Sequence, residues 1–229
     1  MNLDDPVGAS LRGAHAAFAV GIGRVLRYDA GVASFAAVPV DPTPADWADL
    51  AALLGPGGFA DLFSSPATPP ADWEPVFTLP GLQLVAGSLV GVADAGVEVV
   101  ELGAGDVPDM LALVDRSRPG PFWPRTHEMG TYLGVRDGGG LVAMAGERLR
   151  PPGWSEISAV TTAPQARGRG LAGLLVTELA RRIRARGEEA FLHVAADNLP
   201  AIRLYDALGF EVRREVTFRG FRVPPGVPA

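Results

Sequence analysis

Hydrophobic and polar positions alternate along residues 154–162, where β-branched side chains are also frequent. This period of two predicts a β-strand. From residue 171 onward, leucines recur at the intervals that place side chains on one face of a helix. Gly168 and Gly170 lie between the two segments, where the backbone must turn tightly. The pattern therefore predicts a strand, a glycine loop and an amphipathic helix in direct succession.

Similar patterns in the rest of the chain predict a mixture of short helices and strands. Helices are expected at residues 9–19, 42–55, 106–116, 170–186 and 198–208. Strands are expected at residues 20–28, 34–38, 58–63, 73–79, 82–86, 97–102, 131–136, 141–149, 154–162, 191–195, 210–217 and 218–223. The expected class is α/β in the broad sense and α+β in the narrower one.

The small, glycine-rich segment 87–96 is the best candidate for a domain boundary. We expect an N-terminal α+β domain of unknown role at residues 1–90 and a second domain at residues 97–223. The proline-rich end at residues 224–229 is expected to be a flexible tail.

Charge is distributed unevenly along the 229 residues, whose formal net charge is −6. Residues 1–95 hold ten acidic and three basic side chains, a net of −7, and residues 96–229 carry a net of +1. The C-terminal part therefore suits an anionic ligand better, and no nucleic-acid partner is expected. The chain has no cysteine, which excludes disulfides, thiolate catalysis and zinc–cysteine sites, and no metal site is expected. An acidic N-terminus and the lack of a long apolar run favour a cytoplasmic protein without membrane contact.

The glycine loop is a candidate phosphate site, because exposed amides at the start of a helix attract anions. The spacing Gly168-x-Gly170-x-x-Gly173 also matches the dinucleotide-binding fingerprint. That alternative is disfavoured, because residues 163–167 separate the first glycine from the strand and only 56 residues follow the last one. A P-loop is excluded because the chain has no Gly-Lys-Ser/Thr sequence.

Two further motifs follow the strand at residues 154–162. They are Gln165-x-x-Gly168-x-Gly170 and Asn198-x-x-Ala201-Ile-x-x-Tyr205-x-x-x-Gly209-Phe210. Together with the order of elements, they resemble the GNAT superfamily of acetyl-CoA-dependent N-acetyltransferases over about residues 97–222. The resemblance implies a mixed, mostly antiparallel sheet flanked by helices. Residues 1–90 show none of these motifs, and we interpret them as a separate unit or as a diverged copy of the fold.

The resemblance implies roles for the glycine loop and for the strand before it. The loop would bind the pyrophosphate of CoA through Gln165, Ala166, Arg167, Gly168, Arg169, Gly170, Leu171 and Ala172. The strand would splay from its neighbour and leave main-chain groups of Ser158 and Val160 for the pantetheine arm. The Val160 amide would donate to the thioester oxygen, where it stabilises a developing oxyanion.

Asn198 and Tyr205 are seven residues apart, so they share one face of the predicted helix. The resemblance implies that Asn198 holds the CoA arm and that Tyr205 protonates the departing thiolate. An ordinary tyrosine pKa near 10 keeps the hydroxyl protonated at neutral pH, which suits an acid.

The acceptor amine must be neutral to attack, and two residues are candidates for the base that deprotonates it. Glu156 shares a strand face with Ser158 and Val160 if the period of two holds. His193 lies five residues before Asn198, and histidine titrates near neutral pH. Both candidates stay open. The resemblance also places Trp123, Thr126 and His127 at the substrate pocket.

These observations predict an N-acetyltransferase that moves acetyl from acetyl-CoA to a primary amine by direct attack in a ternary complex. An acyl-cysteine intermediate is excluded because cysteine is absent. The alternative is a non-catalytic acyl-CoA-binding regulatory module with residues 1–90 as its interaction surface. The expected partners are acetyl-CoA and an amine, and the expected state is a monomer or a homodimer.

Overall fold

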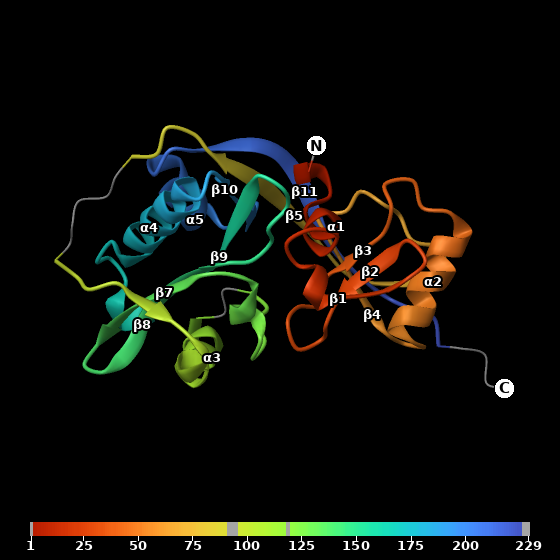
Figure 1. Ribbon diagram of the computed structural model, residues 1–229, viewed down its shortest axis with the longest axis horizontal. Helices are drawn as coiled ribbons and strands as arrows, with labels where there is room; N and C mark the ends of the chain where they lie inside the picture. Colours follow the sequence, from red (N-terminus) through yellow and green to blue (C-terminus); the bar gives the residue numbers. More distant parts are fainter. Residues whose placement is uncertain (1, 91–95, 118–119, 226–229) are drawn as a thin grey trace.

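One eight-stranded sheet runs through the molecule and frames the fold (Figure 1). The computed structural model describes residues 2–90, 96–117 and 120–225. In spatial order the strands are β4 (Phe59–Phe63), β11 (Phe210–Arg222), β5 (Glu74–Ala86), β10 (Glu189–Ala195), β9 (Trp154–Thr162), β8 (Gly140–Glu147), β7 (Tyr132–Asp137) and β6 (Val100–Leu102). Within this described sheet only β9 and β10 pair in parallel, and every other neighbouring pair is antiparallel. The expectation of a mixed, mostly antiparallel sheet is confirmed.

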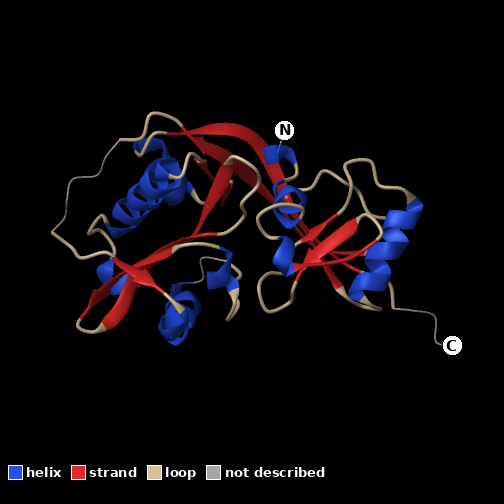
Figure 2. Cartoon of the chain, in the orientation of Figure 1, coloured by secondary structure: helices blue, strands red, loops and turns tan. Residues whose placement is uncertain are grey.

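Helices cover both faces of the C-terminal part of the sheet. They are α3 (Val107–Ser117), α4 (Leu171–Ala185) and α5 (Leu199–Ala207). In Figure 1, α4 and α5 lie on one side of strands β7 to β9 and α3 lies on the other, and Figure 2 shows the same layers coloured by type of element. The predicted apolar stripe of α4, including Leu175 and Leu179, is buried against β8, β9 and β10. This packing fixes where α4 begins, beside the end of β9.

The N-terminal residues form a smaller layer beside the opposite end of the sheet (Figure 1). Its elements are α1 (Pro6–Leu11), β1 (Ala19–Ile22), β2 (Val25–Tyr28), β3 (Ala36–Ala37) and α2 (Pro44–Leu54). Short 3-10 turns lie at Asn2–Asp4, Ala16–Phe18, Ala104–Asp106, Thr126–Met129 and Pro164–Ala166. The strands form a separate sheet in the order β1-β2-β3. A parallel bridge between Phe35 and Asp61 connects this layer to β4, and so to the large sheet.

Both predicted halves contribute to the large sheet. Strand β5, from residues before the expected boundary, lies between β10 and β11 and pairs with both. Strand β4, also from the first half, pairs with the far end of β11. The division of the chain at residue 90 stays a prediction, and so does the interpretation of residues 1–90 as a diverged copy. Parts of the expected linker, residues 91–95, and of the tail, residues 226–229, lie outside the described residues.

The predicted element boundaries were wrong at two places where tertiary pairing overrides local signals. Residues 73–79 and 82–86 form one strand, because β11 holds the chain in register straight through Pro80 and Gly81. A Cβ atom at position 81 would lie 2.3 Å from the ring of Phe218, so only glycine allows the backbone of β5 to run this close to that ring. Residues 210–217 and 218–223 are likewise a single strand.

The predicted helix at residues 9–19 was also wrong in its bounds. Helix α1 begins earlier, since the Asp5 side chain accepts a hydrogen bond from the Gly8 amide and Pro6 occupies the first turn. The chain leaves the helix at Arg12, and only a 3-10 turn follows at Ala16–Phe18.

Candidate active site

Strands β9 and β10 part in the middle of the sheet. Their parallel pairing ends at Glu156 and Phe191, although both strands continue. Gly146 pairs with Ser158 and Met144 pairs with Thr161, so two residues of β9 oppose one residue of β8. This is a β-bulge, and it contains Ala159 in the left-handed region with φ of 52°. The extra residue breaks the period of two at Ala159. Alternation therefore still relates Glu156 to Ser158, but it no longer relates either of them to Val160.

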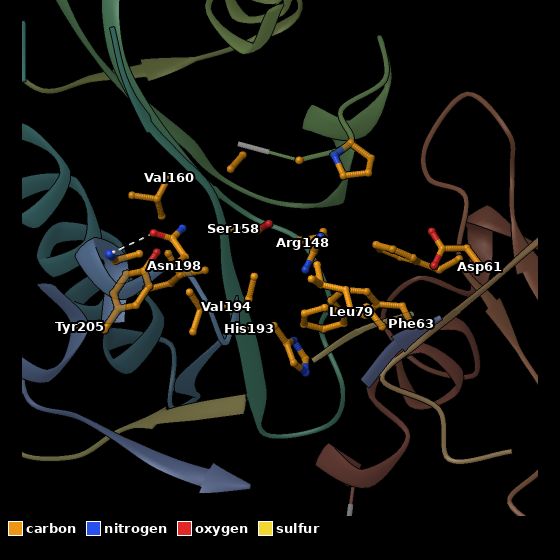
Figure 3. Close-up of a pocket in the computed structure, with 18 of the residues that line it drawn as sticks. Asp61, Phe63, Leu79, Arg148, Ser158, Val160, His193, Val194, Asn198 and Tyr205 are labelled. Atoms are coloured by element: carbon orange, nitrogen blue, oxygen red, sulfur yellow. Dashed lines mark hydrogen bonds between the residues drawn. The ribbon is translucent and has the colours of Figure 1, made fainter. Parts of the chain in front are cut away.

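A cavity of about 360 Å³ occupies the space where the two strands part. Ser158 and Val160 line it from β9, and His193 lines it from β10. Figure 3 shows Tyr205 and Asn198 at one end of the cavity and Phe63 and Asp61 at the other. The cavity therefore extends from the motif-bearing C-terminal part of the chain to the N-terminal layer.

Helix α5 delivers two predicted site residues to the first end of the cavity. Asn198 is its N-cap, and its side-chain oxygen accepts a hydrogen bond from the Ala201 amide at 3.3 Å. Tyr205, two turns later, is buried but lines the cavity, and its hydroxyl donates no hydrogen bond within the described residues. Burial raises the pKa of Tyr205 to about 12. The phenol is therefore a proton donor, not an acceptor, at neutral pH.

The glycine loop leads into the N-terminus of α4 with its amides bare. Gly168 and Gly170 both adopt left-handed conformations, with φ of 77° and 75°. Gly170 is the N-cap of α4 and, as a glycine, has no side chain that could make a capping hydrogen bond. Along the described chain, the amides of residues 168–170 donate no backbone hydrogen bond. Bare amides at the positive end of a 15-residue helix make an anion site.

The side chains of the loop differ in their burial and in their contacts. Ala166 and Leu171 are buried and anchor the loop on the core. Gln165 and Arg167 are exposed, and Arg169 donates a hydrogen bond to Asp137 at 2.7 Å. Ala172 is half-buried in the first turn of α4. The main chain, more than the arginines, thus defines the anion site.

Glu156 lies in a buried ion pair beneath the cavity. Arg148 donates two hydrogen bonds to its carboxylate, at 2.8 and 2.7 Å. His193 contacts the same carboxylate through Nδ1 at 2.6 Å. Burial by itself would raise the pKa of Glu156, but the charge and hydrogen bonds of Arg148 outweigh it and hold the pKa at about 2. A carboxylate with so low a pKa and both oxygens engaged is a weak base.

His193 is neutral and fully engaged. Gln83 donates a hydrogen bond from its amide nitrogen to the Leu3 carbonyl, and the same nitrogen lies 3.1 Å from Nε2 of His193. Since Gln83 is the donor there, His193 Nε2 accepts and Nδ1 carries the proton toward Glu156. Burial lowers the pKa of His193 below its ordinary value, more strongly than Glu156 raises it. The lone pair that a base would need is therefore occupied.

The predicted substrate residues after the proline-rich loop lie away from the cavity. Thr126 is buried, where it donates to the Val32 carbonyl at 2.7 Å and accepts from the Trp123 amide at 2.8 Å. His127 contacts the Pro124 carbonyl through Nδ1. None of the three is among the described residues that line the cavity, whereas Pro121 of the same loop is. Substrate contact through Trp123, Thr126 and His127 stays a prediction.

Sequence reasoning missed Asp61 and Arg148, which both line the cavity. Asp61 is buried between Ala60 and Leu62 in β4, and it accepts a hydrogen bond from the Ser34 hydroxyl at 2.5 Å. An acidic residue in the middle of an apolar strand could have indicated a site, because acidic side chains are rarely buried unless they are paired. Arg148 carried no such signal, since a second arginine, Arg150, lies two residues away.

Comparison with known proteins decides the family. A solved structure from Novosphingobium aromaticivorans DSM 12444, assigned to the GNAT family of acetyltransferases, is 39% identical to this chain. The match covers 99% of this chain and 100% of the other, with a TM-score of 0.87. The chain belongs to the GNAT family. The FR47-like protein family also matches residues 132–219. The resemblance inferred from the glycine loop and from the Asn198/Tyr205 helix is thereby confirmed.

Curated relatives of this GNAT protein match over shorter stretches. A mycothiol acetyltransferase from Brachybacterium faecium is 33% identical over 159 residues, which are 66% of this chain and 47% of the relative. The N-alpha-acetyltransferase RimI from Mycobacterium tuberculosis is 40% identical over 83 residues, which are 35% of this chain and 51% of the relative. The chain spans between about a fifth and about half of the length of the curated relatives it matches. Across the described ranges, no helix of the GNAT protein has the length and apolar character that crossing a membrane requires.

Proposed function

We propose that this GNAT protein transfers acetyl from acetyl-CoA to a primary amine by direct attack in a ternary complex. The observation that carries the proposal is the cavity between the parted strands β9 and β10, with Tyr205 at one end and Phe63 and Asp61 at the other. A thioester placed there can be reached by a second substrate from the far end. Family membership supports acetyl-CoA as the donor.

The loop before α4 suits the pyrophosphate of CoA. Bare amides at Gly168 to Gly170 provide hydrogen-bond donors, and the helix dipole adds positive potential. The pantetheine arm would then extend along β9, past Val160 and Ser158, where no strand pairs on the β10 side in the described sheet. Asn198, at the start of α5, borders the same path.

The chemistry requires a hydrogen-bond donor for the thioester oxygen and an acid for the sulfur. The Val160 amide is the proposed donor, because an amide directed at a developing oxyanion stabilises the tetrahedral state. Tyr205 is the proposed acid, because its raised pKa keeps the phenol protonated and its hydroxyl is uncommitted within the described residues. The absence of cysteine excludes an acyl-cysteine intermediate and is consistent with direct transfer from the thioester to the amine.

The structure does not favour either Glu156 or His193 as the base that deprotonates the acceptor amine. Glu156 lies outside the cavity lining and holds a pKa of about 2, and His193 uses its lone pair on Gln83. These contacts favour a positioning role for both residues, in which they hold β9 and β10 together just below the point where they part.

Release of free CoA from acetyl-CoA over a panel of amines tests the proposal. The panel includes alkyl and arylalkyl amines, amino acids and peptides with a free N-terminus, the last because one relative is named an N-alpha-acetyltransferase. Turnover with at least one amine, together with product heavier by one acetyl group, is expected. Intersecting lines in a two-substrate kinetic analysis are expected for a ternary complex. Tight acetyl-CoA binding without turnover on any amine would instead indicate a non-catalytic binding module.

A further inference from the structure

The far end of the cavity is built almost entirely by residues that carry no family motif. We define this acceptor end by the residues that line it: Phe35, Asp61, Phe63, Phe77, Leu79 and Phe218. Five of the six are apolar, and Asp61 is the exception. Phe63 stacks on Phe218 with ring centroids 4.8 Å apart, so the wall beside Asp61 is rigid and aromatic. Figure 3 shows Asp61 and Phe63 together, on the opposite side of the cavity from Tyr205.

Asp61 is a buried carboxyl group that forms no ion pair with any described residue. It is 5% exposed, and its one hydrogen-bond donor in the described structure is the neutral hydroxyl of Ser34. No ion pair involves Asp61 within residues 2–90, 96–117 and 120–225. Burial raises the pKa of Asp61 above its ordinary value, although Ser34 and Arg148 partly oppose this. A buried carboxylate in this state is stabilised by any cation that enters the cavity.

The charged groups around Asp61 do not neutralise it, so one positive charge on a ligand would complete the charge balance of the cavity. Arg148 is held by Glu156 through two hydrogen bonds, and it lies over the rings of Phe35 and Phe63 at 5.0 and 4.6 Å. Its charge is therefore balanced by Glu156. His193 is neutral because burial lowers its pKa. When Asp61 is ionised, its charge is the one among the described lining residues that no hydrogen-bonded ion pair balances, and a ligand with a single positive charge neutralises it.

Resting on the proposed acetyl transfer, we propose that Asp61 binds the ammonium group of an apolar primary amine at the acceptor end and takes up its proton, which frees the neutral amine to move to the thioester. The aromatic walls would hold the apolar body of the acceptor, and a carboxylate next to the amine would restore an unbalanced negative charge. Asp61 is thus a catalytic residue supplied by β4, which gives residues 1–90 a role in acceptor choice.

The proton balance of the step is complete. The ammonium loses one proton to the Asp61 carboxylate, and the neutral amine forms a C–N bond with the thioester carbon. The C–S bond breaks, and the CoA thiolate takes a proton from Tyr205. The second proton lost by the nitrogen restores Tyr205 through solvent, and Asp61 returns its own proton to solvent. The overall result is an acetamide, free CoA and one released proton.

Binding of 2-phenylethylamine to the CoA-loaded protein tests the site without requiring turnover. Calorimetric titration is expected to show binding to the wild type and at least tenfold weaker binding to Asp61→Asn. Phenylalanine, which adds a carboxylate, and 2-phenylethanol, which lacks the charge, are each expected to bind at least tenfold more weakly than the amine. Asp41→Asn, which removes an exposed acid, serves as the charge-matched control and is expected to bind like the wild type. No binding of 2-phenylethylamine, or equal binding of phenylalanine, would overturn the proposal.

Turnover separates this proposal from the proposed acetyltransferase function. With 2-phenylethylamine, Asp61→Asn is expected to lower kcat/KM at least 100-fold while acetyl-CoA binding stays within twofold. In the wild type, kcat/KM is expected to fall as the pH drops through the raised pKa of Asp61, and this limb is absent in Asp61→Asn. Ser34→Ala, which removes the hydrogen bond, is expected to move the limb to higher pH. Wild-type turnover with an unchanged Asp61→Asn variant would overturn the role of Asp61 alone. Amine binding that depends on Asp61 without any turnover would overturn the acetyltransferase function alone.

Discussion

The imidazole of His193 and the carboxylate of Glu156 share a 2.6 Å hydrogen bond with side chains that are 1% and 0% exposed. The two residues come from neighbouring strands. Glu156 is the last residue of β9 that pairs with β10, and His193 lies two residues beyond the last paired residue of β10. Arg148 completes the cluster from the other side of Glu156. This buried contact joins the strands on one side of the cavity and keeps the opening beyond it in place.

Glu156→Gln should destabilise the protein strongly. The variant leaves the buried Arg148 without its counter-ion, and breaking a buried pair from one side costs about 3–5 kcal/mol. Urea unfolding measures the change in the free energy of unfolding. Glu98→Gln is the matched control, because Glu98 is exposed and forms no ion pair in the described chain. A loss below about 1 kcal/mol for Glu156→Gln would show that Arg148 finds another partner.

The free energy of unfolding should fall as the pH drops below 6.5. His15 and His193 are both buried, and burial lowers the pKa of each below the ordinary histidine value of 6.5. Below that pH the unfolded chain binds protons that the folded chain does not, so stability decreases with acidity. Each histidine contributes up to about 1.4 kcal/mol per pH unit in this window. Chemical unfolding between pH 7.5 and 5.5 measures the slope, and a flat profile would mean that both rings protonate freely in the folded state.

Tyr205→Phe should lower kcat while acetyl-CoA binding is retained. The hydroxyl makes no hydrogen bond within the described residues, and the ring can keep its edge contact with Phe210, so packing is preserved. Loss of a general acid lowers the rate by about 100-fold or more. Steady-state kinetics and acetyl-CoA titration separate the two effects. An unchanged kcat would remove Tyr205 from the acid role.

Tyr132→Phe provides the control for that substitution. The Tyr132 hydroxyl is buried and has no hydrogen-bond partner in the described structure, so its removal should leave stability unchanged or raise it by about 1 kcal/mol. Because Tyr132 lies outside the cavity lining, kcat should not change. A comparable loss of kcat in both variants would point to a general packing effect.

Gly168→Ala should weaken acetyl-CoA binding by about tenfold. A methyl group at this position meets no atom within 4 Å, so the cost arises from the left-handed φ of 77°. For a residue with Cβ that conformation costs about 1–2 kcal/mol, and relief of the strain would redirect the bare amides. Gly187→Ala is the control, because Gly187 has a φ of 78°, equal free space, and lies after the opposite end of α4. Both variants should lose similar stability, and only Gly168→Ala should lose affinity for acetyl-CoA.

The sequence by itself determined the elements that rest on local chemistry. Strand β9 occupies the predicted residues 154–162, because alternation and β-branched residues act within one strand. Helix α5 begins after Asn198, because an N-cap needs only its own helix. The spacing of Gly168 and Gly170 likewise indicated a bare helix N-terminus and the GNAT family, which the structural relative confirms.

Only the tertiary structure decided what depends on contacts between distant segments. The bulge at Ala159 arises from the pairing with β8, and it ends the alternation on which the grouping of Glu156 with Val160 relied. The same pairing across the sheet turned Glu156 from a base candidate into the partner of Arg148. Asp61 reaches the cavity because β4 joins a sheet completed about 150 residues later by β11, and no local pattern records such a pairing. Burial and charge neutralisation, which set the pKa of each carboxyl group, exist only once these segments meet.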